Sequence, residues 1–221
     1  MKSNIIEFQN YQRKCPAGVK YTKREKRKDI SRADKKKIEA AVRELLQEKG
    51  VEAAGGVDIV SIAKREGFLV QKVYLPPETV GFLAVNEEEF IEGTESHKWI
   101  VINRGFVNAE NEAGLELKKS RFIAAHEYGH YMLHRGNLKK FAHKDTGESS
   151  SREDLEADYF ARSMLMPLDI FQMVCRMLAG RISRSEEEEN YDRKVEYLSD
   201  IFKVTQECVR RRLEDLLELS N

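Results

Sequence analysis

Apolar residues recur near the start of this chain with helical spacing. The first helical pattern lies between Ser31, a good N-cap residue, and Gly50, a good C-cap residue. Its apolar residues share one helix face through the i, i+3, i+4, i+7 spacing: Ile38, Ala41, Val42, Leu45 and Leu46. A shorter helix is predicted from Val57 to Glu66, where Gly67 ends it.

Three segments rich in β-branched and aromatic residues follow these helices. They predict strands at 68–74 (FLVQKVY), 81–85 (GFLAV) and 98–103 (KWIVIN). Prolines 76 and 77 mark a turn after the first strand, and the acidic segment NEEEFIEGTES separates the last two. We expect these strands to form a small, mostly antiparallel three-stranded sheet.

From residue 119 onward the pattern is helical. Helices are predicted at about 119–135, 151–166, 168–179, 192–202 and 205–218. Ser150 or Ser151 is the expected N-cap of the second of these, and Pro167 ends it. The polar segment GNLKKFAHKDTGESSS separates the first two and is left without an assigned element. The fold class is therefore predicted to be α+β, with the sheet packed on a helical bundle.

Composition narrows the class of protein. The 221 residues include 38 basic and 38 acidic side chains, and 41% of them are apolar. This composition is too charged for a membrane protein and too apolar for a disordered one. No stretch approaches the ~18 apolar residues that a membrane span needs. The N-terminal sequence MKSNIIEFQN lacks the pattern of a secretory signal. We expect a cytoplasmic protein whose cysteines, Cys15, Cys175 and Cys208, are reduced.

Charge is concentrated near the N-terminus. Residues 12–37 are rich in lysine and arginine and contain few apolar residues. This segment is interpreted as a solvated or disordered arm, or alternatively as a basic tail that contacts nucleic acid or an acidic partner. The net charge of zero argues against a protein that coats nucleic acid generally.

The sequence HEYGH at 126–130 has the spacing H-E-x-x-H. Residues four apart lie on nearly the same helix face, about 6 Å apart along the axis, so His126 and His130 can share one metal ion. Zinc accepts imidazole nitrogen and leaves a position for water. Glu127 is placed to reach that water and to take its proton as general base. The sequence thus predicts one Zn²⁺ per chain and Glu127 as the catalytic residue.

The alternative interpretation is a surface helix with two ordinary histidines. Two features argue against it. The flanking RFIAA segment favours a buried helix, where two histidines and a glutamate are costly without an ion. Gly129 lies inside the helix at a cost of ~1 kcal/mol relative to alanine, which suggests a close approach by substrate or backbone.

A zinc site of this kind needs a third protein ligand. His134 continues the four-residue spacing, but three such histidines on a straight helix cannot converge on one ion, so it is interpreted as supporting the site or the core. The next helix offers Glu153, Asp154, Glu156 and Asp158. One carboxylate on the metal, followed one turn later by another that bonds a ligand histidine, is a common arrangement. Alternatively, these acids stabilise the helix N-terminus through its dipole.

These motifs resemble the ImmA/IrrE family of zinc metallopeptidases. RFIAAHEYGHYMLH (121–134) is similar to the family pattern R-F-x-x-A-H-E-x-G-H-x-x-L-H. EADYFARSMLMP (156–167) is similar to the pattern E-x-E-A-[ND]-x-F-A-x-x-L-L-M-P. The resemblance extends more loosely over residues 55–217, where YLSDIFKVTQECVRRRLEDL is like the family's closing, helix-turn-helix-like pair. It does not cover residues 1–50.

The resemblance implies roles for individual residues. His126 and His130 match the metal ligands of a zincin-type active-site helix, and Glu127 matches the general base. The third ligand position falls on Asp154, an aspartate where glutamate is usual, with Glu156 and Glu153 as alternates. Asp158 matches the position that supports a ligand histidine, a supporting role also given to His134.

The resemblance also implies a function and a division of the chain. Family members are cytoplasmic regulatory proteases, often encoded beside a helix-turn-helix repressor that they cleave or inactivate. We therefore expect a basic arm and helix (1–50), a zinc metallopeptidase domain (51–180) that cleaves a repressor-type regulator, and a helix-turn-helix-like segment (181–221). The alternative is a zinc-holding, non-proteolytic module that binds protein or DNA. Direct DNA binding through the arginines at 210–212 is less favoured because acidic segments flank them.

Overall fold

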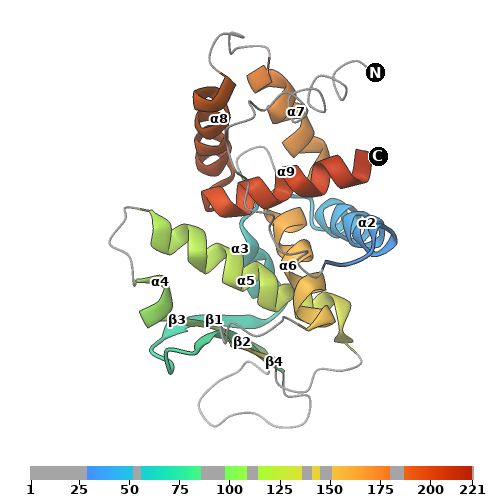
Figure 1. Ribbon diagram of the computed structural model, residues 1–221. Coiled ribbons are helices and arrows are strands. Elements are labelled where there is room, and N and C mark those ends of the chain that lie inside the picture. The colour runs from blue at the N-terminus through green and yellow to red at the C-terminus, as the bar shows by residue number, and fades with distance from the viewer. Residues whose placement is uncertain are drawn as a thin grey trace.

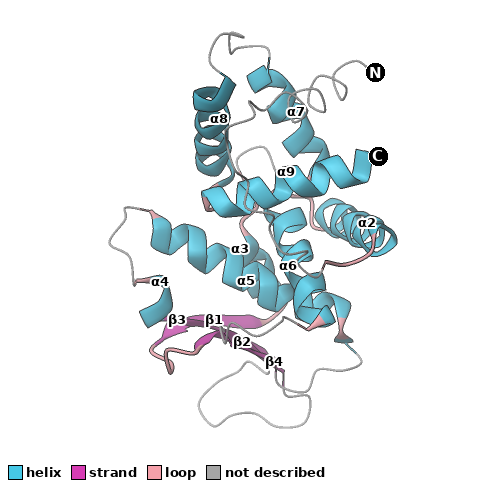
Figure 2. Cartoon of the chain, viewed as in Figure 1, coloured by secondary structure: helices cyan, strands magenta, loops and turns pink. Residues whose placement is uncertain are grey.

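Helices predominate in this protein and lie mostly on one side of a single small sheet (Figure 1, Figure 2). The computed structural model describes residues 29–51, 56–85, 98–108, 114–135, 141–144, 151–179 and 187–220. Most of the basic arm and Cys15 therefore lie outside the described residues. Within them, the arrangement confirms the predicted α+β class.

The described part of the chain forms eight helices and four strands. The helices are α2 (Arg32–Glu48), α3 (Ile59–Arg65), α4 (Arg104–Val107), α5 (Leu115–Leu133), α6 (Arg152–Leu165), α7 (Leu168–Ala179), α8 (Glu187–Phe202) and α9 (Gln206–Ser220). The strands are β1 (Phe68–Val73), β2 (Thr79–Val85), β3 (Lys98–Asn103) and β4 (Phe141–Lys144). Ser31 caps α2 and Ser151 caps α6, each by accepting a hydrogen bond from a backbone N–H, as predicted.

The strands are ordered β1-β3-β2-β4 in the sheet. β2 pairs antiparallel with β3 and β4, whereas β1 pairs in parallel with β3. The three predicted strands are present and the pairing is mostly antiparallel, as expected. β4 adds a fourth strand at one edge, inside the polar segment to which the sequence pattern assigned no element.

Helix α5 lies directly on the sheet, and a glycine makes this approach feasible. A Cβ atom added to Gly81 of β2 would lie 2.7 Å from Cγ2 of Ile123 and 2.8 Å from the carbonyl oxygen of Val101. Contacts that short would force the helix and strand apart. On its other side α5 packs along α6, so the HEYGH segment lies between the sheet and α6 (Figure 1).

Helix α2 packs on α6 and α9 through a buried lysine. Lys35 is fully buried, and its Nζ donates to carboxylates of Asp29, Asp215 and Glu218 at 2.7, 3.1 and 2.6 Å. Asp215 also accepts from Nε of Arg162 on α6 at 2.8 Å. One carboxylate of α9 therefore joins the first described helix to the helix that follows the HEYGH segment.

A second buried cluster on α2 centres on Glu39. Its Oε1 accepts from the hydroxyls of Tyr159 and Ser163, both at 2.8 Å. The same carboxylate pairs with Arg212 of α9, which is only 1% exposed. Charges are buried at such a place only when they are paired and hydrogen-bonded. The division of the chain into an N-terminal arm and a metallopeptidase domain at residue 50, expected from the sequence, stays a prediction.

Arg121 of α5 connects this helix to the end of α8, just before α9. Arg121 donates to the carbonyl oxygens of Phe202 and Lys203, at 2.8 and 2.7 Å, and to that of Val57 at 2.7 Å. Lys203 has a left-handed backbone (φ 53°), which ends α8 sharply. Among the described helices, none is long and apolar enough to cross a membrane.

Candidate metal centre

One face of α5 presents His126, Glu127 and His130 to the interior of the protein. These side chains belong to residues that are 2%, 0% and 1% exposed. Because His126 and His130 are one helical turn apart, their rings come together, and their Nε2 atoms lie 3.0 Å from each other. Two ligand-type nitrogens therefore converge at a buried point.

Asp154 of α6 joins the two histidines. Its Oδ1 lies 3.4 Å from Nε2 of His130, and one ligand-type atom from each of the three residues lies within 4.8 Å of the other two. The structure thus brings together the two predicted histidines and the carboxylate at the predicted third position.

The start of α6 orients Asp154. The backbone N–H of Ser151 donates to Oδ2 of Asp154 at 3.0 Å, and the backbone N–H of Asp154 donates to Oγ of Ser151 at 3.1 Å. This reciprocal capping box fixes the carboxyl group with Oδ1 turned toward the histidines. Capping and ligation, which the sequence left as alternatives, use different oxygens of the same side chain.

Asp158 orients His126. Its Oδ1 lies 2.8 Å from Nδ1 of His126, and since a carboxylate only accepts, that nitrogen carries the proton. Nε2 of His126 is then unprotonated where it faces His130 and Asp154. Burial works against protonation of His126, but the hydrogen bond to Asp158 and neighbouring negative charge raise its pKa overall. A more basic imidazole is a stronger metal ligand.

His130 is supported differently. Its Nδ1 lies 3.3 Å from Nδ1 of His134, the other predicted supporting residue. Nε2 of His134 lies 3.0 Å from Oε2 of Glu156. Burial lowers the pKa of His130 and so favours its neutral form, which is the form that binds metal.

The two alternate ligands do not join the cluster that the described residues form. Glu156 faces His134 and Arg152 instead of the two histidines of HEYGH. Glu153 has no place in the cluster either. The sequence did not reveal the role of Glu156, because it depends on a partner across two helices.

Glu127 is a buried carboxylate beside the cluster. Within the described structure neither of its oxygens has a hydrogen-bond partner of ordinary geometry. Burial raises the pKa of Glu127 to about 7, although His126 and the nearby backbone of Leu83 favour the charged form. A carboxyl group held this way is costly for stability and typical of functional sites.

The donor set fits a zinc ion. Two imidazole nitrogens and one carboxylate oxygen are ligands that zinc prefers, and three protein ligands leave a fourth position for water or substrate. The second nitrogen of each histidine is engaged by another side chain, as in metal sites generally. The buried carboxylate of Glu127 lies beside the set without being part of it.

The C-terminal arginines are occupied within the molecule. Arg212 is buried against Glu39, so it cannot reach a phosphate group. Arg210 pairs with Asp192 at 3.2 Å. Arg211 pairs with Glu214 at 3.0 Å. All three arginines therefore have acidic partners within the described structure.

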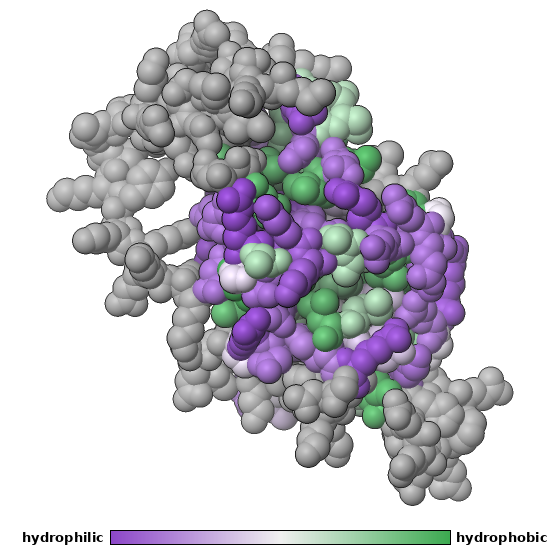
Figure 3. All heavy atoms as spheres, turned by 90° about the vertical axis from the view of Figure 1, so that its right-hand side faces the viewer, coloured by the Kyte–Doolittle hydropathy of each residue, from purple (hydrophilic) through white to green (hydrophobic). Residues whose placement is uncertain are grey.

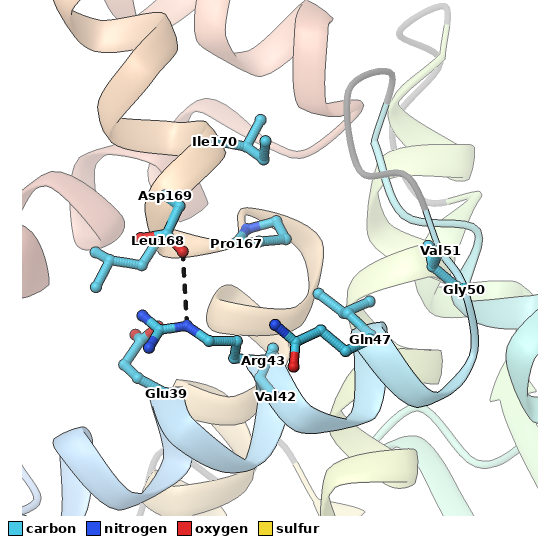
Figure 4. A pocket seen from close by; sticks show the side chains of 11 residues that line it. Glu39, Val42, Arg43, Gln47, Gly50, Val51, Pro167, Leu168, Asp169 and Ile170 are labelled. Atoms are coloured by element: carbon cyan, nitrogen blue, oxygen red, sulfur yellow. Dashed lines mark ion pairs between the residues drawn. The ribbon is translucent and has the colours of Figure 1, made fainter.

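A pocket of about 610 Å³ lies between α2 and the start of α7, apart from the metal centre. Val42 and Leu46 from α2 and Pro167, Leu168 and Ile170 around the start of α7 give it apolar walls. Figure 4 shows the ion pair between Arg43 and Asp169 at its edge, with Nε and Oδ2 3.5 Å apart. Apolar surface between hydrophilic residues is also visible on the face drawn in Figure 3. The pocket contains no member of the His126–His130–Asp154 cluster.

Comparison with known proteins gives one match to a family. The Peptidase M78 family model, described as the IrrE N-terminal-like domain, matches residues 109–214. The matched residues include all of α5 and α6, and therefore the whole candidate metal centre, whereas α2 lies outside them. No curated protein matches the chain. The match supports the ImmA/IrrE family and a metallopeptidase-type function.

Proposed function

We propose that this protein is a zinc-dependent endopeptidase that cleaves one specific regulatory protein, a helix-turn-helix repressor. The observation that carries the proposal is the convergence of His126, His130 and Asp154 next to the buried carboxylate of Glu127. The match of residues 109–214 to a peptidase family supports it independently of that geometry.

His126 and His130, with Asp154, would hold the zinc ion. When bound, zinc supplies a Lewis acid that polarises the scissile carbonyl and makes a water molecule more acidic. The orientation of His126 by Asp158 and of Asp154 by Ser151 fixes two of the three ligands before any ion binds.

Glu127 is the proton carrier in this proposal. Its carboxylate takes a proton from the attacking water and delivers it to the amine of the departing peptide. A pKa of about 7 suits both steps, because the group is neither too weak a base nor too weak an acid near neutral pH. Burial between α5 and β2 keeps the group away from bulk water.

The substrate class comes from the family resemblance alone. A repressor-type regulator is the expected partner, and cleavage would release the genes that it controls. The buried or paired state of Arg210–Arg212 gives no support to a DNA-binding alternative.

Mass spectrometry of a candidate repressor tests the proposal. A helix-turn-helix protein encoded beside this gene is incubated with zinc-loaded wild-type protein and with Glu127→Gln. We expect a discrete cleavage with the wild type and a loss of at least about 100-fold in rate with the variant, as for removal of a general base. Cleavage at equal rates by both would reject the mechanism. A full equivalent of zinc without cleavage of the cognate repressor would instead favour the zinc-holding, non-proteolytic module.

A further inference from the structure

The support of His130 extends through further side chains of α5 and α6. The contacts run from His130 to His134 and from His134 to Glu156, at 3.3 and 3.0 Å. Glu156 also accepts from Nε of Arg152, with Oε1 2.8 Å away. His134 and Glu156 are largely buried, with side chains 10% and 18% exposed.

These contacts engage one ring nitrogen of His130 and leave the other to the cluster. Nδ1 of His130 faces His134, whereas Nε2 faces Asp154 and His126. Glu156 is a carboxylate and only accepts, so Nε2 of His134 donates in the contact between them.

The contacts continue from Arg152 to helix α2. Nη2 of Arg152 donates to Oδ2 of Asp34 at 3.1 Å. Asp34 is itself fixed in the first turn of α2, since Oγ of Ser31 donates to its Oδ2 at 2.7 Å. Helix α2 lies outside the residues that match the peptidase family, yet it lies at the end of this series of contacts.

We propose that His134 and Glu156 are positioning residues that fix the ring of His130 with Nε2 facing Asp154 and His126, and that Asp34 of α2 supports them through Arg152. None of these four side chains belongs to the cluster that would hold the metal. Their effect is to hold the imidazole ring in the orientation that metal binding needs. This inference rests on the proposed metal site but not on proteolysis.

Zinc affinity of the full-length protein, measured by competition with a chelator, tests the proposal. His134→Phe and Glu156→Leu should each weaken binding by about 10- to 100-fold. Glu156→Gln keeps an oxygen that can accept from His134, so it should retain more affinity than Glu156→Leu. Melting curves of the metal-free variants check that they fold. Affinities within about twofold of the wild type in both His134→Phe and Glu156→Leu would contradict the proposal.

The contribution of α2 needs a matched control. Asp34→Asn should weaken zinc binding by up to about fivefold, the range expected for loss of a partly exposed ion pair. Asp169→Asn removes another ion pair of α2, that with Arg43 on the pocket edge, and should leave zinc affinity unchanged. Equal effects of the two variants would remove α2 from the site. If zinc binds with these dependences but no repressor is cleaved, the endopeptidase proposal alone fails.

Discussion

A Cβ atom added to Gly129 would lie 3.0 Å from Cδ1 of Phe160, so the glycine of HEYGH fits directly against α6. The backbone of α6 is also close, with the carbonyl oxygen of Ala157 3.3 Å from the same point. The sequence suggested that substrate or backbone closely approaches Gly129, and in the structure the close neighbour is helix α6. The same close approach of α6 brings Asp154 next to the histidines.

Gly129→Ala should therefore weaken zinc binding more than it weakens the fold. Overpacking costs about 1–3 kcal/mol, and the better helix propensity of alanine returns about 1 kcal/mol. A small shift of α6 would move Asp154 away from His130, and we expect a loss of about tenfold or more in zinc affinity. Chelator competition measures this loss.

A double variant separates this effect from general destabilisation. Phe160→Leu removes the ring that the new methyl group meets, so it should restore part of the affinity lost in Gly129→Ala. If the double variant loses as much affinity as the two single variants together, the Gly129–Phe160 contact does not control the position of Asp154.

Asp158→Asn should lower zinc affinity by about 10- to 100-fold, since its carboxylate fixes Nδ1–H of His126 and raises the basicity of the ring. Isothermal titration with zinc measures the change. Asp192→Asn, which removes an acid from a surface ion pair of α8 and α9, is the matched control and should bind zinc as the wild type does. An Asp158→Asn protein with wild-type affinity would argue against the assigned role.

The Glu39–Arg212 pair should make the fold sensitive to acid. Burial alone would raise the pKa of Glu39, but the charge and hydrogen bonds of Arg212, with those of Tyr159 and Ser163, hold it below the usual 4.5. Because the folded pKa is the lower one, the pair contributes stability above pH 4.5 that is lost as the pH falls through the folded value. The free energy of unfolding should thus decrease over that interval.

Glu39→Gln isolates this contribution. Leaving Arg212 buried without its anion should cost about 3–5 kcal/mol at neutral pH, and the acid dependence of stability should become shallower. Glu48→Gln, on an exposed position of the same helix, should change stability by no more than about 0.5 kcal/mol. Urea unfolding at pH 7 and pH 4 provides both comparisons. Equal acid sensitivity in wild type and Glu39→Gln would refute the assignment.

Arg121→Met should destabilise the protein by about 3 kcal/mol or more, because three backbone carbonyls lose a charged donor and two of the bonds are buried. The end of α8 should show faster hydrogen exchange than the rest of the helix. Arg32→Met removes one exposed bond to the carbonyl oxygen of Leu219 and serves as the control. Similar stability in the two variants would contradict the role given to Arg121.

The fold was predictable where local pattern decides it. The helices at α2, α6 and α7 follow from apolar spacing and from caps at Ser31 and Ser151, which act over a few residues. Strand β4 was missed because FAHK is short and lies in a polar segment, so its pairing with β2 decides its structure. α8 begins at Glu187 instead of near 192, since its acidic first turn carries no apolar signal.

In the candidate site, contacts within one helix were predictable from the sequence, whereas contacts between helices were not. Spacing alone placed His126 and His130 together, because one helix carries both. The position of Asp154 required the resemblance, and the partner of Glu156 could not be inferred, since it depends on how α5 and α6 face each other. Lys35 and Glu39 look like surface charges in the sequence, yet they are buried by partners on α9.

The central claim is that His126, His130 and Asp154 hold one zinc ion. Elemental analysis combined with zinc-edge X-ray absorption of the purified protein tests it most directly. The account predicts one zinc per chain with two imidazole nitrogens at about 2.0–2.1 Å, and loss of the metal in the double variant His126→Ala/His130→Ala. A protein that takes up no zinc, or that retains a full equivalent in that double variant, would contradict it.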